Sequence, residues 1–153
     1  MNTEVSTPSH HRVILSFSSF DPVRDHSPEY VNIRVAYEME KSVEEYSRQN
    51  KIMMSHRLYD LDHEWDLDRA LVLSLALMGV SALLLGTRKN NKSWLSVAAS
   101  QFAFLIQHTV SGWCPHASVL RRLGLRSYRE IEAEKYALKT VRGDFDQQML
   151  EAA

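Results

Sequence analysis

The chain has 153 residues, the length of one domain or of one small domain with tails. Its 18 lysines and arginines nearly balance its 19 aspartates and glutamates, and the net charge of -1 argues against a nucleic-acid partner. A single cysteine excludes an internal disulfide framework and a zinc cluster of several thiolates. Composition alone therefore indicates no reaction.

The N-terminal residues 1–26 are rich in Ser, Thr, Pro and His, with one apolar patch from Val13 to Phe17. We predict a flexible tail that holds a short extended piece at this patch. The segment is not a signal peptide, because no early basic region precedes a long apolar core.

Residues 27–69 are predicted to form a cytoplasmic helical region. Ser27 is suited to cap a helix whose first residue is Pro28, and apolar residues follow at helical spacing. A second helical stretch is expected from about Lys51 to Trp65, and it leads toward the next segment.

Acidic residues alternate along the end of this region: Asp60, Asp62, Glu64, Asp66 and Asp68. Asp60, His63 and Glu64 share part of a helical face, as ligands do in carboxylate-bridged metal sites. Such sites draw ligands from two or more helices, and the chain has no second matching motif. We therefore favour solvated acids that meet the positive N-terminal end of the following helix, and we expect no metal or other cofactor.

Residues 70–114 hold the strongest pattern. No charged residue occurs from Ala70 to Thr87 or from Ser93 to His116, and the loop between these runs is basic. Two uncharged, mostly apolar runs joined by a short loop are typical of a transmembrane helical hairpin. The predicted fold is all-α, a two-helix transmembrane hairpin with flanking amphipathic cytoplasmic helices.

The predicted spans cover about 70–87 and 94–113, or about 25 Å and 30 Å as helices. The first is short, and it reaches across if Arg69 and Arg88 extend toward the headgroups. The tryptophans stand where an interfacial aromatic belt would place them, at Trp65, Trp94 and Trp113.

A soluble helical bundle that buries the hairpin is the alternative. Gln101, Gln107 and His108 in the second run are its best support. Against it, the first run has no charged face, and the rest of the chain is too short to cover two apolar helices. We favour the membrane hairpin.

Basic residues near the hairpin set the predicted orientation. Lys51, Arg57 and Arg69 precede it, and more basic residues flank it than occupy its loop. By the positive-inside rule both termini are then cytoplasmic, with the following residues as the topology-setting group after the hairpin: Arg121, Arg122, Arg126 and Arg129.

Residues 115–153 are predicted to form a cytoplasmic C-terminal helix and tail. Ser127 and Glu130 have the spacing of a capping box, and the helix that they open runs to about Arg142. Gly143 supplies its stop.

Several segments together resemble the YgaP-like inner-membrane transmembrane domain family, a bacterial domain of unknown function. They are Leu61-Asp-His-Glu-Trp-Asp-Leu-Asp-Arg-Ala70, Gly112-Trp-Cys-Pro115, Leu120-Arg-Arg-Leu-Gly124 and the closing run Glu134-Lys-Tyr-Ala-Leu-Lys139. The resemblance covers roughly residues 58–145. It implies a multi-pass protein of the bacterial inner membrane that self-associates. The rhodanese module of the family's namesake is absent, so sulfur transfer is not implied.

Cys114 is the candidate reactive thiol. It lies at the cytoplasmic end of the second predicted span, and the basic pair Arg121 and Arg122 that follows favours a thiolate or persulfide carrier. A small apolar residue at a helix end is the simpler interpretation, and we favour it. A phosphatase loop would place arginine six residues after the cysteine, where this chain has Leu120.

The intramembrane polar residues Gln101 and His108 lie one heptad apart. They suit polar packing between helices better than ligation of a metal or haem, because one imidazole is not a ligand set. Small or polar residues at helical spacing form a predicted packing stripe, within the hairpin or between two copies: Ser74, Met78, Ser81, Ser96, Ser100, Ala103, Gln107 and Ser111.

Two classes of function are compatible with the sequence. The first is a non-enzymatic integral membrane module that anchors, oligomerises or assembles a larger membrane complex, with the lipid bilayer and a second copy of the chain as partners. The second is a thiol-dependent sulfur or anion carrier or transport protein that uses Cys114.

Overall fold

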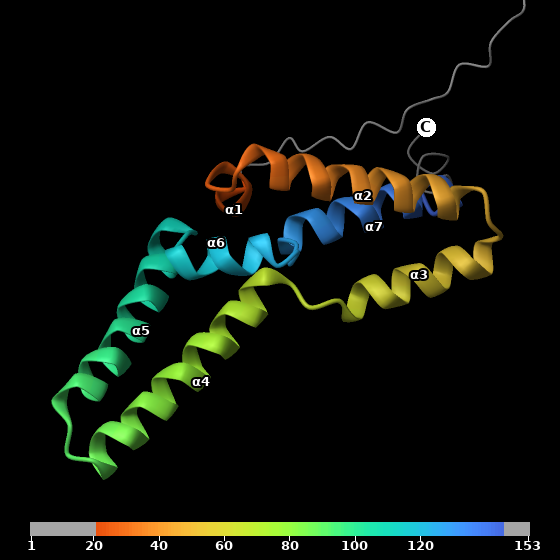
Figure 1. Ribbon diagram of the computed structural model, residues 1–153. Helices are drawn as coiled ribbons and strands as arrows, with labels where there is room; N and C mark the ends of the chain where they lie inside the picture. The colour runs from red at the N-terminus through yellow and green to blue at the C-terminus, as the bar shows by residue number, and fades with distance from the viewer. Residues whose placement is uncertain (1–20, 146–153) are drawn as a thin grey trace, which may run out of the picture.

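The computed structural model describes residues 21–145, which form helices and no strand, so the all-α prediction is confirmed for this part of the chain. The chain divides into a base and an arm (Figure 1). The arm consists of α4 and α5. The elements are α1 (Pro22–Asp25), α2 (Glu29–Ser47), α3 (Lys51–His63), α4 (Leu67–Arg88), α5 (Lys92–Ser111), α6 (Pro115–Arg122) and α7 (Tyr128–Arg142).

The base consists of α1, α2, α3, α6 and α7. Helix α7 packs against both α2 and α3, so the predicted cytoplasmic helices pack on one another. Helix α2 buries every fourth residue, and this period of about one turn places Val31, Val35, Met39 and Val43 on one stripe. The apolar cluster under α7 contains Val43, Leu58, Leu61, Ile131, Ala137 and Leu138.

The arm is an antiparallel pair that projects from the base (Figure 1). Helix α4 turns one stripe toward α5, with buried residues Leu71, Leu75, Gly79, Ala82 and Gly86. We call this contact line the arm seam. Small residues let the two backbones approach closely. At the loop between α4 and α5, which we call the tip, a Cβ on Gly86 would lie 2.8 Å from Cδ2 of Leu95 and 3.2 Å from its backbone nitrogen, so the close approach there favours glycine.

The end of the arm nearest the base, which we call the root, packs against the base through an apolar cluster. Leu67, Leu71 and Leu75 of α4 meet Cys114 and Ala117 of the α6 region, and Val23 of α1 joins them. The backbone N–H of Leu67 also donates to the carbonyl of Arg126 at 2.9 Å. The arm therefore leaves the base in a fixed direction.

Several helix ends follow the sequence. Ser127 and Glu130 form the capping box predicted for α7, and Gly143 ends that helix in the left-handed conformation. Asp66 caps α4 by accepting from the N–H of Arg69 at 2.7 Å. Because this cap acts before Leu67, α4 begins earlier than the predicted residue 70.

The N-terminal prediction needs correction. Residues 22–25 form α1 rather than part of a flexible tail, while the patch from Val13 to Phe17 lies outside the described residues. Ser27 does not cap α2, because its hydroxyl donates to the carbonyl of Val23 at 2.5 Å. Pro28 stands at the cap position, and α2 begins one residue later than predicted.

Candidate functional site

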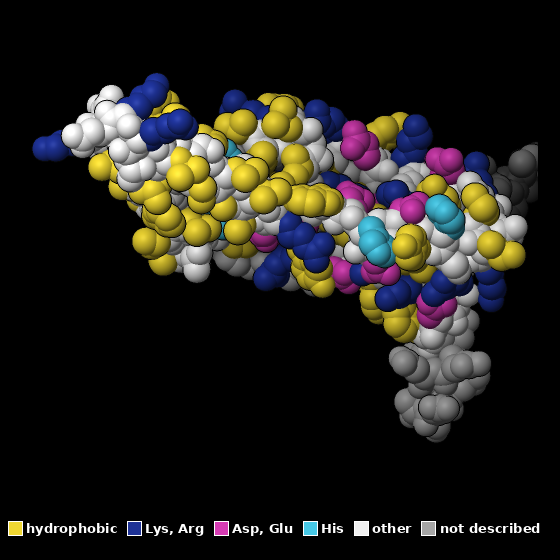
Figure 2. Space-filling model, turned by 90° about the horizontal axis from the view of Figure 1, so that it is seen from below, with side chains coloured by type: hydrophobic (Ala, Val, Ile, Leu, Met, Phe, Trp, Pro, Cys, Tyr) yellow, Lys and Arg dark blue, Asp and Glu magenta, His cyan; other side chains and the backbone are white. Residues whose placement is uncertain are grey.

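The arm carries a continuous apolar surface that faces away from the protein. Figure 2 shows hydrophobic side chains along it and basic side chains at its tip. Leu77 is 60% exposed and Leu84 is 64% exposed on α4, and Phe102 and Ile106 are similarly exposed on α5. A soluble monomer rarely exposes an apolar patch of this extent, so the arm surface is the first candidate site.

One stretch of the described chain, within Lys51–Arg88, is long and apolar enough to cross a membrane. Only 28% of its most apolar window is buried, unlike the core helix of a soluble protein. Of the two predicted spans only the first therefore passes this test, and α5 does not. Gln101, Gln107 and His108 lower the mean hydropathy of α5.

Hydroxyl groups on the arm hydrogen-bond to their own helix. Ser74 donates to the carbonyl of Leu71 at 2.9 Å, and Ser100 donates to the carbonyl of Val97 at 2.7 Å. The same holds for Ser96, Thr109 and Ser111. Such internally bonded hydroxyls cost little in an apolar solvent.

The predicted packing stripe does not form the arm seam. Ser81, Ser96, Ala103, Gln107 and Ser111 are exposed, and Ser74 and Ser100 are only half-buried. The intra-hairpin version of the prediction is therefore wrong. Leucines and glycines of α4 take that place because the helix turns its i, i+4 row of Leu71 and Leu75 toward α5. Packing between two copies stays a prediction.

The two predicted intramembrane polar residues occupy different places. Gln101 is buried in the seam, where its Cβ lies 3.6 Å from an ideal Cβ on Gly79. Nε2 of His108 lies 3.1 Å from Oδ1 of Asp68 at the root of the arm. Among the described residues no three His, Cys, Asp or Glu side chains are grouped to hold a metal ion.

Cys114 is fully buried in the apolar cluster at the root. It stands at the cap position of α6 without a hydrogen bond from its side chain to that helix. An incoming sulfur species or anion has no access to a thiol in this place. The geometry favours the packing interpretation of Cys114 and gives the carrier alternative no support.

The alternating acids do not converge on one point, because each meets a different partner. Asp60 pairs with His56, Asp62 with Lys135 and Glu64 with Arg126. Asp66 caps α4 and Asp68 in its first turn meets His108, so only these two of the five acids lie at the start of the next helix, and Asp66 is buried rather than solvated.

A buried ionic network joins the helices of the base. Arg121 and Glu130 are almost completely buried and make two contacts of 2.5 Å. Glu134 of α7 accepts from Arg57 at 2.8 Å, from Ser42 at 2.6 Å and from Arg126. Paired in this way, the buried charges offset one another, although Nε of Arg121 is buried without a hydrogen-bond partner among the described residues.

This network sets the ionisation of its members. Burial alone would raise the pKa of Glu134, but hydrogen bonds from Ser42 and Arg126 outweigh it and hold that pKa below its ordinary value. Burial likewise works against the charge of Arg126, yet hydrogen bonds to Glu64 and Glu134 raise its pKa. Glu134 and Arg126 therefore both stay charged at neutral pH.

The predicted topology-setting arginines fall into two groups. Arg121 and Arg126 are buried in the network, whereas Arg122 and Arg129 are exposed. Sequence reasoning missed Glu130 and Glu134. A usable signal was present, because these acids occupy the buried stripe of α7 together with Ile131, Ala137 and Leu138.

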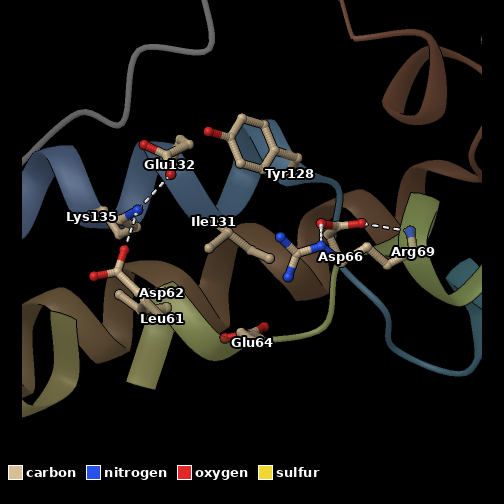
Figure 3. Close-up of a pocket in the computed structure, with 9 residues that line it drawn as sticks. All are labelled: Leu61, Asp62, Glu64, Asp66, Arg69, Tyr128, Ile131, Glu132 and Lys135. Carbon is tan, nitrogen blue, oxygen red and sulfur yellow. Dashed lines mark hydrogen bonds and ion pairs between the residues drawn. The ribbon is translucent and has the colours of Figure 1, made fainter. Parts of the chain in front are cut away.

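A polar groove of about 210 Å³ opens where the base meets the arm (Figure 3). Asp62 and Glu132 both contact the ammonium of Lys135 at 2.6 Å at one end. At the other end Nε of Arg69 lies 3.3 Å from Asp66. The groove is lined by Leu61, Asp62, Glu64, Asp66, Arg69, Tyr128, Ile131, Glu132 and Lys135.

Comparison of the chain with known proteins finds no matching family model, curated protein or solved structure. The resemblance to the YgaP-like family therefore stays a prediction.

Proposed function

We propose that this protein is a non-enzymatic membrane module that anchors and assembles, with the arm inserted in a lipid bilayer and the base held at its surface. The observation that carries the proposal is the exposed apolar surface of the arm. It is bounded by the basic tip at one end and by the charged base at the other. A bilayer removes such a surface from water without any further protein.

Both helices of the arm enter the bilayer together in this proposal. Helix α4 has 22 residues and α5 has 20, or about 33 Å and 30 Å, which matches the hydrocarbon thickness. Helix α5 is too polar to qualify alone, but α4 covers Gln101 and Asp68 meets His108 at the root. Pairing thus lowers the cost of moving α5 into lipid.

The orientation has the base on the cytoplasmic side and the tip on the other. Exposed Arg122 and Arg129 lie on the base side, and Arg88, Lys89 and Lys92 extend from the tip to the far headgroups. The resemblance to an inner-membrane family supports placement in the bacterial inner membrane. Neither end of the described chain crosses the bilayer in this arrangement.

Carbonate extraction of membranes tests the insertion. We expect the full chain to stay in the membrane pellet. Leu77→Arg places a charge at the middle of α4, where it costs about 3 kcal/mol, and it should shift protein to the supernatant.

Ile33→Arg is the matched control, because Ile33 is 61% exposed on α2 and lies in the base. It should leave the protein in the pellet. Release of the unaltered chain by carbonate, or equal retention of Leu77→Arg and the unaltered chain, would overturn the proposal.

Self-association supplies the assembly part of the proposal. The exposed residues Ser96, Ala103, Gln107 and Ser111 form a small, polar face on α5 that a second copy can approach closely. Ala103→Leu should weaken a cross-linked dimer in detergent, while Phe102→Leu on a different face of α5 should not. A dimer band unchanged by Ala103→Leu would contradict this interface.

A further inference from the structure

The polar groove of Figure 3 has an apolar neighbour. A shallow trough of about 600 Å³ runs along the first half of α4, lined by Trp65, Asp68, Arg69, Val72, Leu73 and Ala76. The groove and the trough share Arg69. A molecule that occupies both must therefore be polar at one end and apolar at the other.

Charge is unevenly placed along the groove. At the end formed by α3 and α7, two carboxylates contact a single ammonium, so these three groups sum to one negative charge, and Lys139 is a further cation that acts on Asp62. The ammonium of Lys135 is buried beneath them, with 13% of its side chain exposed, whereas Asp62 is 54% exposed. The groove therefore presents carboxylate oxygens, rather than the lysine, to an incoming group.

The other end of the groove presents a cation. Nε of Arg69 contacts Asp66, and its guanidinium turns into the groove in Figure 3. Its two terminal amino groups have no partner among the described residues, so they can bind two oxygens of one phosphate. From the arm toward the base, the site therefore presents an apolar trough, then a guanidinium, and then two carboxylates.

We infer that this composite site binds a phospholipid whose headgroup carries a primary ammonium, of the phosphatidylethanolamine class. Its acyl chains lie along the trough on α4, its phosphate meets Arg69, and its ammonium reaches Asp62 and Glu132. The inference rests on the proposed membrane function, because that function places the root of the arm at the headgroup level.

The charges that line the site distinguish phosphatidylethanolamine from phospholipids with other common headgroups. A phosphatidylcholine has no N–H to donate to the two carboxylates. A phosphatidylglycerol can satisfy Arg69, but it brings no cation to the two carboxylates at the far end. Only the zwitterion with N–H donors matches both ends.

Native mass spectrometry of the full chain in detergent measures this preference. The three lipids are supplied in equal amounts with identical acyl chains. We expect phosphatidylethanolamine adducts to exceed phosphatidylcholine adducts about fivefold, as charge-assisted hydrogen bonds of about 1 kcal/mol imply.

Glu132→Gln and Arg69→Gln should each remove the preference, because each removes the charge that meets one end of the headgroup. Arg129→Gln alters an exposed arginine of α7 that lines neither the groove nor the trough, and it should leave the lipid preference intact. Equal adducts of the three lipids, an excess of phosphatidylglycerol, or a preference that survives in either groove variant would overturn the inference.

Carbonate extraction distinguishes failure of the inferred lipid site from failure of the proposed membrane function. A chain that stays in the membrane pellet but shows no lipid preference lacks the headgroup site and keeps its anchoring role. A chain released by carbonate lacks that role whatever its adducts in detergent.

Discussion

The base and the arm both pack one helix stripe against a neighbour, but they bury opposite chemistry. In the base, Glu130 and Glu134 of α7 form buried ion pairs with Arg121 and Arg126. In the arm, the seam contains leucines, glycines, alanines and one glutamine, and no charged residue. Their outer surfaces are reversed, with charges around the base and apolar side chains along the arm (Figure 2).

Under the proposed function, this reversal suits two regions in different solvents, with water around the base and lipid around the arm. The base has a polar exterior that water stabilises, and its interior charges are paired. The arm has an apolar exterior, so close packing through glycine rather than apolar burial must hold its helices together. The junction is the place where both requirements meet, and it holds the polar groove.

Breaking the network in the base gives the largest expected effect. Glu130→Ala leaves the guanidinium of Arg121 buried without its carboxylate, which should destabilise the base by about 3–5 kcal/mol. Unfolding in detergent, followed by helical circular dichroism, measures the loss. Glu44→Ala is the control, because Glu44 and Arg48 form a largely exposed pair on α2 and should contribute less than about 0.5 kcal/mol. Equal effects of the two variants would contradict a structural role for the network.

Two glycines of the arm seam test how closely α4 and α5 pack. Gly86→Ala should open the tip and destabilise the arm by about 1–2 kcal/mol, since its Cβ would also lie 3.2 Å from the backbone nitrogen of Leu95. Gly79→Ala meets only ordinary contacts and should be neutral or stabilising by up to about 1 kcal/mol. Thermal unfolding and the distance between spin labels at Thr87 and Ser93 test the pair. A gain in stability from both substitutions would argue against close packing at the tip.

The base, unlike the arm seam, should respond to acid. The folded pKa of Glu134 lies below its ordinary value, so its contribution to stability is present above about pH 4.3 and is lost as the pH falls through the folded pKa. Chemical denaturation between pH 7 and pH 3 measures the slope. Glu134→Gln should reduce that slope, although it also lowers stability at neutral pH. An unchanged slope would mean that other carboxylates dominate.

Cys114 should give the smallest effect. Cys114→Ala removes one buried sulfur from the cluster at the root, at a cost of about 1 kcal/mol, and should leave membrane insertion unchanged. Labelling of the native thiol by a maleimide should be slow, and it should become fast in denaturant. Rapid labelling of the native protein would restore the carrier hypothesis for this residue.

The sequence predicts the local features of this fold well and the partners of its charges poorly. The capping box at Ser127, the stop at Gly143 and the all-α class follow from residues close together in the chain. The partners of Arg121 and Arg126 do not, because they depend on how α7 packs: Glu130 and Glu134 lie on α7, eight or nine residues along the chain, and Glu64 follows α3. The packing stripe predicted within the hairpin was wrong for the same reason, because a row of small residues does not indicate which neighbouring helix it contacts.

Two uncharged runs, a basic loop between them and helix ends on both sides can be read from the amino-acid sequence alone. These follow from local spacing and from the cost of charge in an apolar solvent. Three features depend instead on the packing of the helices: which stripe of α4 faces α5, the burial of Cys114, and the position of Arg69 between a polar groove and an apolar trough. These depend on how helices distant in the chain rotate and pack against one another, and packing is a property of the whole molecule.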